Sequence, residues 1–114
     1  MRRPTLAEIR GAFWALRSLR VARRSLAADP LVLLQLPRVP AGPAGERGVA
    51  VALAEARATC LERASIQQEW LRSNGIARDV IIGVTGPREF SAHAWLDGDG
   101  DAREHIEIMR RPAR

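Results

Sequence analysis

The sequence predicts an α+β fold in which helices come first and a small antiparallel sheet follows. Three observations lead to this class. Apolar residues recur at helical spacing up to residue 73, and β-branched apolar residues gather between residues 78 and 109. A connector rich in Pro and Gly, at residues 37–45, interrupts the helical part. With 114 residues in total, the chain fits a single domain, because the part before this connector is too short for a core of its own.

The first helix begins with a capping-box pattern, in which Thr5 is the cap and Glu8 stands three residues later. Apolar residues then follow helical spacing at Ile9, Ala12, Leu16 and Leu19. Asp29 and Pro30 form an N-cap and first-turn pair, which predicts a short second helix ending at Leu36.

Two further helices are predicted at residues 46–57 and 60–73, with the pair Ala58-Thr59 interrupting them. Asn74-Gly75 supplies a left-handed cap at the end of the second.

Three strands are predicted after the helices, at residues 78–85, 90–96 and 105–109. Gly86-Pro87 turns the chain between the first two. The stretch from Gly98 to Asp101 is typical of a hairpin turn, so the second and third strands are expected to be neighbours.

The composition limits the classes of partner that the protein is expected to bind. The net charge is +5, all 18 basic residues are arginine, and seven of them fall in the first 24 residues. Such a block attracts nucleic acid, an anionic membrane or an acidic protein, or is simply a solvated face. Aromatic residues interleaved for base stacking are missing, which disfavours nucleic acid.

The sequence also indicates a soluble protein of the cytoplasm. The start, Met1 to Pro4, lacks the apolar core of a signal peptide. The longest strongly apolar run, from Leu31 to Leu36, is far short of the roughly 20 residues that span a bilayer. The single cysteine excludes an internal disulfide.

That cysteine, Cys60, stands at a predicted helix start, and His93 lies in a predicted strand. A helix N-terminus and a neighbouring imidazolium both favour the nucleophilic thiolate, and an imidazole can take and return the proton. The same residues also suit a plainer interpretation. A lone cysteine is usually buried and inert, and a lone histidine in a strand is usually a hydrogen-bonded structural residue.

Metal sites are poorly supported, and no cofactor is expected. An EF-hand loop beginning at Asp97 requires glycine and glutamate where Ala102 and Ile108 stand. A zinc site could use Cys60, His93 and His105, but these residues lack the paired spacing that is typical of zinc ligands.

Three segments, at residues 58–64, 74–84 and 90–96, together resemble the transglutaminase-like cysteine proteases of lasso-peptide biosynthesis. The resemblance covers about residues 44–110. It implies a papain- or transglutaminase-like core in which Cys60 attacks and His93 is the base. It also implies a substrate, a ribosomally made precursor peptide whose leader is removed before a separate cyclase closes the ring.

The family places an aspartate beyond the His-Ala-Trp motif, on the next strand, as the third catalytic residue. This sequence offers Asp97, Asp99, Asp101, Glu104 and Glu107. Turn aspartates usually point to solvent. A turn centred on Gly100 places Glu107 opposite His93, which favours Glu107, whereas a tighter turn brings Glu104 diagonally near.

Fused members of the family carry a leader-recognition domain before the protease. This chain starts with arginine-rich helices, so it resembles the split form, which relies on a separate recognition protein. Residues 1–36 are then expected to be a docking region, with Phe13, Trp14 and the arginine face contacting that protein. Residues 46–110 form the expected catalytic core. Trp70 and Trp95 are expected in the core.

Two alternatives to the peptidase stay open. One is a transglutaminase-like transfer of the acyl group to an amine, which differs only in the second nucleophile. The other is a non-catalytic, basic binding module on the same fold.

Overall fold

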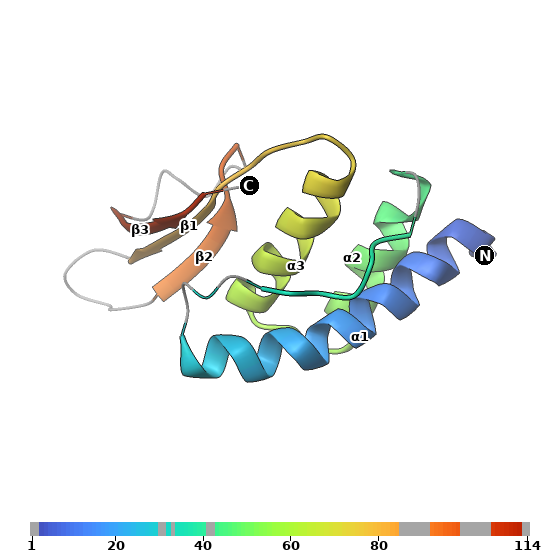
Figure 1. Cartoon of the computed structure of the whole chain (residues 1–114), viewed down its shortest axis with the longest axis horizontal. Coiled ribbons are helices and arrows are strands. Elements are labelled where there is room, and N and C mark those ends of the chain that lie inside the picture. The colour runs from blue at the N-terminus through green and yellow to red at the C-terminus, as the bar shows by residue number, and fades with distance from the viewer. Residues whose placement is uncertain are drawn as a thin grey trace.

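The computed structural model describes residues 3–29, 32, 34–40, 43–84, 92–98 and 106–112. It confirms the α+β class. Figure 1 shows α3 lying between α2 and the sheet, with α1 running along the lower side of the molecule. The elements in chain order are α1 (Leu6–Ala28), the 3-10 turn η1 (Pro43–Gly45), α2 (Glu46–Glu55), α3 (Cys60–Ser73), β1 (Val80–Val84), β2 (Ala92–Leu96) and β3 (Ile106–Arg111).

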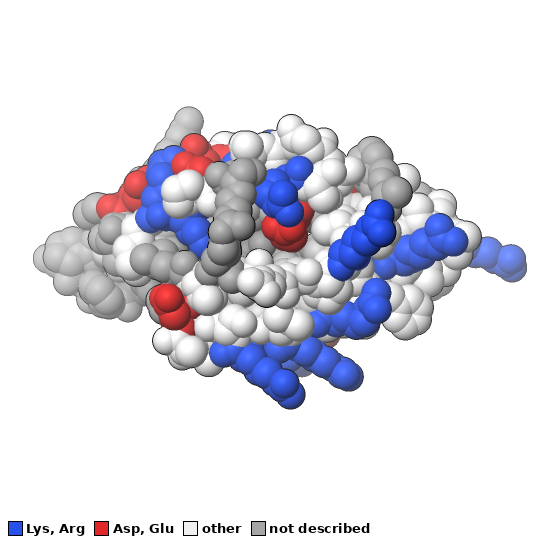
Figure 2. All heavy atoms as spheres, viewed as in Figure 1, with Lys and Arg blue, Asp and Glu red and all other residues white. Residues whose placement is uncertain are grey.

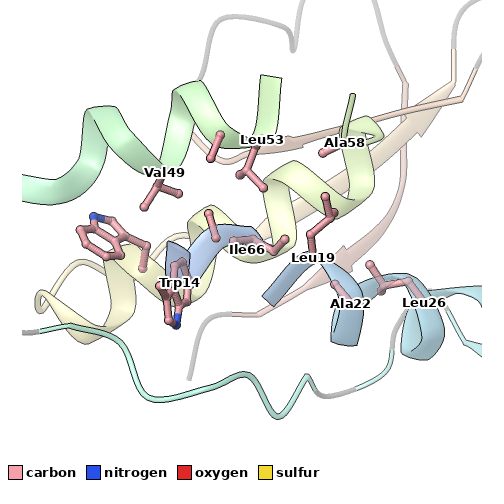
Figure 3. Packing of buried hydrophobic residues seen from close by; sticks show 11 residues of the cluster. Trp14, Leu19, Ala22, Leu26, Val49, Leu53, Ala58 and Ile66 are labelled. Carbon is pink, nitrogen blue, oxygen red and sulfur yellow. The ribbon is translucent and has the colours of Figure 1, made fainter. Parts of the chain in front are cut away.

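The three helices enclose the larger of two apolar cores, which Figure 3 shows from close by. The backbones of α1 and α2 touch where they cross. A Cβ added to Gly48 meets the carbonyl oxygen of Glu8 at 1.9 Å, so only glycine fits there. Although α1 is 23 residues long, neither it nor another helix in the described ranges is long and apolar enough to cross a membrane.

Trp14 lies at the centre of this core rather than on a docking surface, which corrects the sequence prediction. Its side chain is fully buried, its ring centroid is 5.5 Å from that of Trp70, and its Nε1 donates to the carbonyl of Pro37 at 2.9 Å. Trp70 and Trp95 are buried, as predicted. Phe13, the other aromatic residue of the predicted docking surface, is exposed.

The short helix predicted from Asp29 to Leu36 is wrong for the residues described. Asp29 ends α1 by donating its backbone N–H to Ser25, and Val32 and residues 34–40 adopt no helix. This segment runs extended across the helices in Figure 1 and packs apolar side chains on the core, from Val32, Leu34, Leu36 and Val39. The local Asp-Pro signal is overridden by the burial of these side chains.

The second and third helices, α2 and α3, are each followed by a left-handed residue. Gly75 (φ 81°) follows α3, and the N–H of Ile76 closes the turn onto the carbonyl of Leu71 at 2.9 Å, as predicted. At the end of α2 the corresponding left-handed residue is Arg57 (φ 55°), a conformation that glycine adopts without strain.

The sheet is antiparallel, as predicted, but its strand order is β2-β1-β3. The expectation that the second and third strands are direct neighbours is therefore wrong, since β1 lies between them. β1 pairs with β2 from Val80↔Leu96 to Val84↔Ala92, and with β3 from Val80↔Arg111 to Val84↔Ile106. The pairing with β3 shifts register after Ile82, where Ile108 has no partner.

One face of this sheet packs on α3 and forms the second core, which includes Ala64, Val80, Ile82, Ala94 and Leu96. Gln68 also ties α3 to the sheet. Its Nε2 donates to the carbonyl of Arg78 at 2.9 Å and to that of Arg111 at 3.1 Å. The helix that begins with Cys60 is therefore fixed against the strands that follow it.

Candidate active site

Cys60 is the first residue of α3, and a capping box fixes the start of this helix. Thr59 Oγ1 accepts from the backbone N–H of Glu62 at 3.2 Å, and the Glu62 carboxylate accepts from the backbone N–H of Thr59 at 2.8 Å. The thiol is free and half-buried. Cys60 therefore stands where unpaired backbone N–H groups and the helix dipole favour a negative charge.

A side chain from α1 reinforces this helix start. Arg23 Nε donates to the two oxygens of the buried Glu62 carboxylate at 3.2 and 3.4 Å. Arg23 Nη2 also donates to the carbonyl of Ala56, in the link between α2 and α3, at 3.2 Å. Sequence analysis missed this role of Glu62, although a threonine followed three residues later by a glutamate is a recognisable signal.

β2 supplies a hydrogen bond to the sulfur. The backbone N–H of Ala94 donates to Cys60 Sγ at 3.4 Å. β2 is an edge strand, so alternate backbone groups point away from β1, and this N–H is one of them. A thiolate at Cys60 thus has a donor aimed at it from the sheet as well as the dipole of its own helix.

His93 precedes Ala94 and borders the same hollow as Cys60. This hollow has a volume of about 230 Å³ and lies where the start of α3 meets the edge of β2. The half-buried imidazole stacks on Trp95, with ring centroids 5.9 Å apart and an interplanar angle of 19°. Trp95 is thus a wall of the hollow.

The His93 side chain does not lie on the face of β2 that packs against α3. Side chains alternate along a strand, and Ala94 and Leu96 are the residues of β2 that face α3. His93 and Trp95 therefore share the other face of the strand, and the imidazole borders the hollow from the strand edge. The thiol and the imidazole reach one hollow from different sides of β2.

Two polar side chains of α3 also line this hollow, and sequence analysis did not single them out. They are Arg63, which is exposed, and Gln67, which is half-buried. Their spacing from Cys60, three and seven residues along the helix, places them on the same face as the thiol. Helical spacing from the cysteine was the signal that could have found them. Both can donate hydrogen bonds to the backbone of a bound peptide.

Glu107, the predicted acid, lies in one cross-strand row with His93, but β1 separates them. Gly83 pairs with His93 on one side and with Glu107 on the other. The register shift turns Glu107 to the face shared by Gly83 and His93. Strand spacing puts the Cα atoms of residues 93 and 107 about 10 Å apart. A hairpin would make the strands of His93 and Glu107 direct neighbours. Instead, Gly83 of β1 lies between the two residues.

The Glu107 carboxylate binds Arg110. Arg110 Nε and Nη2 donate to it at 3.2 and 2.7 Å, and these bonds hold the pKa of the exposed Glu107 below its usual range. Arg110 Nη1 also donates to Asp79 at 2.8 Å and to Asp97 at 3.2 Å. The hydrogen bonds that Arg110 donates to these carboxylates, that to Glu107 first, raise the pKa of Arg110. The other candidate acids, Asp99, Asp101 and Glu104, lie outside the described residues.

Within the described ranges, no group of three or more His, Cys, Asp or Glu side chains could hold a metal ion. His105, the third residue of the zinc alternative, lies outside these ranges. The groups that the described hollow does bring together are a thiol, an imidazole, an amide and a guanidinium. They suit covalent attack by sulfur on a carbonyl, with proton transfer by the imidazole.

Comparison with protein-family models gives a match that covers most of the chain. The model of the transglutaminase-like superfamily matches residues 6–106, which includes all three helices and both Cys60 and His93. No curated protein and no solved structure matches.

Proposed function

The chain belongs to the transglutaminase-like superfamily, and we propose that it is a cysteine peptidase with Cys60 as nucleophile and His93 as base. The superfamily supports cysteine protease or transferase-type activity. The observation that carries the proposal is the position of the Cys60 thiol. It stands at a capped helix start, accepts a hydrogen bond from Ala94, and shares a hollow with His93.

In the proposed reaction, Cys60 Sγ attacks the carbonyl carbon of the scissile peptide bond, and His93 takes the thiol proton. The carbonyl oxygen gains the electron pair and is stabilised by backbone N–H groups, of which that of Cys60 is the first candidate. The C–N bond then breaks, and His93 returns the proton to the departing amine. Water attacks the resulting thioester and restores the thiol.

Glu107 is the proposed third residue. It shares a row with His93, and the residue between them, Gly83, has no side chain to separate the carboxylate from the imidazole. To reach the imidazole, the carboxylate must leave Arg110, which binds it in this structure. The role proposed for it is to hold the imidazole in one orientation, as acids do in Cys-His-acid sites.

We further propose that the substrate is a lasso-peptide precursor and that the enzyme removes its leader. The support is the resemblance of residues 58–64, 74–84 and 90–96 to leader peptidases of that pathway. On this proposal a separate recognition protein delivers the leader, and a cyclase receives the core peptide. The exposed residue Phe13 of the N-terminal part remains available to a partner, whereas Trp14 does not.

The direct test is incubation of the chain with a candidate precursor and recognition protein, followed by mass analysis of the peptide. Cleavage into leader and core, lost in Cys60→Ser, is the expected result. A product joined to an added primary amine, in place of hydrolysis, identifies the transferase alternative. An intact precursor under all conditions contradicts the leader-peptidase assignment.

A thiol probe separates an enzyme from a non-catalytic module without knowledge of the substrate. Iodoacetamide is expected to label Cys60 at mildly acidic pH, and His93→Ala is expected to slow this labelling about tenfold or more. Arg63→Gln removes a charged neighbour from the same hollow and is the matched control. Equal labelling rates in the wild type and His93→Ala would support the binding module.

A further inference from the structure

We propose that a groove between α1 and α2 binds an acidic, amphipathic helix of a protein partner. This inference rests on the groove itself and not on the proposed peptidase chemistry. The groove is about 410 Å³ in volume and is lined mainly by apolar side chains from the N-terminal half of α1 and from α2. It is separate from the hollow at Cys60, with which it shares no residue.

α1 has two apolar faces, of which the core uses only one. The buried face carries Gly11, Trp14, Ala15, Ser18, Leu19, Ala22 and Leu26. A second stripe is exposed and recurs at spacings of three, four and three residues, at Leu6, Ile9, Phe13 and Leu16. Spacings of three and four are those of the seam by which one helix packs on another in a coiled coil.

The exposure of this stripe is large. Phe13 is 64% exposed and Leu16 42%, and Val51 of α2, on the opposite wall of the groove, is 50% exposed. A contiguous exposed apolar surface of this kind marks an interaction site in a soluble protein. Because α1 and α2 touch through Gly48, the two walls are held at a fixed separation.

The charges beside the stripe indicate the partner. Arg10 and Arg17 directly follow Ile9 and Leu16, so they flank the seam where coiled coils carry the charges that select a partner. Both are exposed, and neither has an ion pair among the described residues. On the face seen in Figure 2, basic side chains project along the edge formed by α1, while much of the acidic surface lies at the sheet end.

The groove itself is also basic. Arg3 and Arg47 line it, and its acidic lining residue among those described, Glu8, is buried and lies 4.0 Å from Arg47. Two copies of this chain would bring like charges together along the seam, which disfavours self-association. A helix with apolar residues at seam spacing and glutamates beside them matches both the shape and the charge.

The test uses two synthetic, fluorescein-labelled peptides of three heptads with leucine at both seam positions. One carries glutamate at the flanking positions and the other lysine. Fluorescence anisotropy with the full chain is expected to show binding of the acidic peptide, weakening as salt rises, and at least tenfold weaker binding of the basic one. Arg10→Glu combined with Arg17→Glu should reverse this preference.

Phe13→Asp should weaken binding of the acidic peptide at least tenfold. The matched control is Ile76→Asp, which changes an exposed apolar residue outside the groove. The rate of Cys60 alkylation should be unchanged in Phe13→Asp, which separates a failure of this inference from a failure of the peptidase proposal.

Four outcomes overturn the inference. The first is equal binding of the two peptides, and the second is binding of the acidic peptide to Phe13→Asp as tight as to Ile76→Asp. The third is binding to phosphatidylserine vesicles alone, through Phe13, which makes the stripe a membrane-binding face. The fourth is a dimer in sedimentation equilibrium that Phe13→Asp dissociates, which makes the occupant a second copy.

Discussion

The two sides of the candidate site are built very differently. On the nucleophile side, three separate elements fix the start of α3: Thr59 and Glu62 cap it, Arg23 of α1 binds the cap, and Ala94 of β2 bonds to the sulfur. On the acid side, the carboxylate of Glu107 binds Arg110 and lies two strands away from the imidazole.

This difference indicates which parts of the site are positioned before substrate arrives. The thiol is held by contacts that do not depend on a ligand, so its geometry is a property of the fold. The acid is engaged elsewhere and must exchange partners to reach His93. We therefore expect changes on the nucleophile side to affect stability most, and changes on the acid side to affect the reaction moderately.

The largest expected effect on stability is that of Glu62→Ala. It removes one half of the capping box and the partner of Arg23, which should lower the free energy of unfolding by about 2 kcal/mol. Urea denaturation measures the change. Glu69→Ala removes the more exposed pair with Arg72 on the same helix and should cost less than about 0.5 kcal/mol. Equal losses in the two variants would show that the contacts of Glu62 stabilise the helix start no more than an ordinary surface ion pair does.

Glu107→Gln tests the acid. If the carboxylate orients His93 during the reaction, the cleavage rate constant should fall about tenfold, which corresponds to about 1.4 kcal/mol. Arg110→Gln releases the same carboxylate and should leave the rate constant at or above that of the wild type. Single-turnover cleavage of the precursor measures both. An unchanged rate constant in Glu107→Gln would mean that Glu107 only forms the ion pair with Arg110 and takes no part in the reaction.

A smaller effect is expected at the turn that precedes Cys60. Arg57 has a left-handed φ of 55°, so Arg57→Gly should relieve strain and raise the free energy of unfolding by about 0.5 kcal/mol. Gly75→Ala is the reciprocal change, at φ 81°, where no atom crowds an added Cβ. It should lower the free energy of unfolding by about 1 kcal/mol because of backbone strain. Thermal unfolding of both variants checks the opposite signs.

The weakest effect should be the pH dependence that Glu107 contributes. Hydrogen bonds from Arg110 lower its pKa in the folded state, so its stabilising contribution is present above the unfolded pKa and is lost as pH falls through the folded value. The difference in urea midpoint between the wild type and Glu107→Gln should be largest near neutral pH and shrink below about pH 4. A difference that is constant from pH 7 to pH 3 would contradict the role of this ion pair.

Local signals predicted the elements well, because caps and glycine turns act within a few residues. The predicted bounds of the helix at 60–73 agree with α3, whose start and end are both set by such signals. The short helix after Asp29 failed for the converse reason. Its cap signal is local, but the conformation of Leu34 and Leu36 is set by their packing on a core whose residues lie far away in the sequence.

The relative positions of the site residues depend on contacts between segments far apart in the sequence, and a local sequence pattern does not contain them. A turn after β2 predicts that the next strand is its neighbour, but β1 takes the central place and separates His93 from Glu107. Helical spacing on α1 likewise shows two apolar faces, but it does not indicate which face packs in the core. Trp14 was therefore assigned to the surface, although the helix buries it and exposes Phe13.

The bond from Ala94 to the sulfur also has a practical meaning for the design of inactive variants. Alanine in place of Cys60 removes the acceptor and leaves the backbone N–H of the buried Ala94 without this partner, which costs stability. Serine retains an oxygen at this position. A catalytically dead protein intended for trapping substrate complexes is thus better made with serine, since alanine leaves this buried backbone donor unpaired.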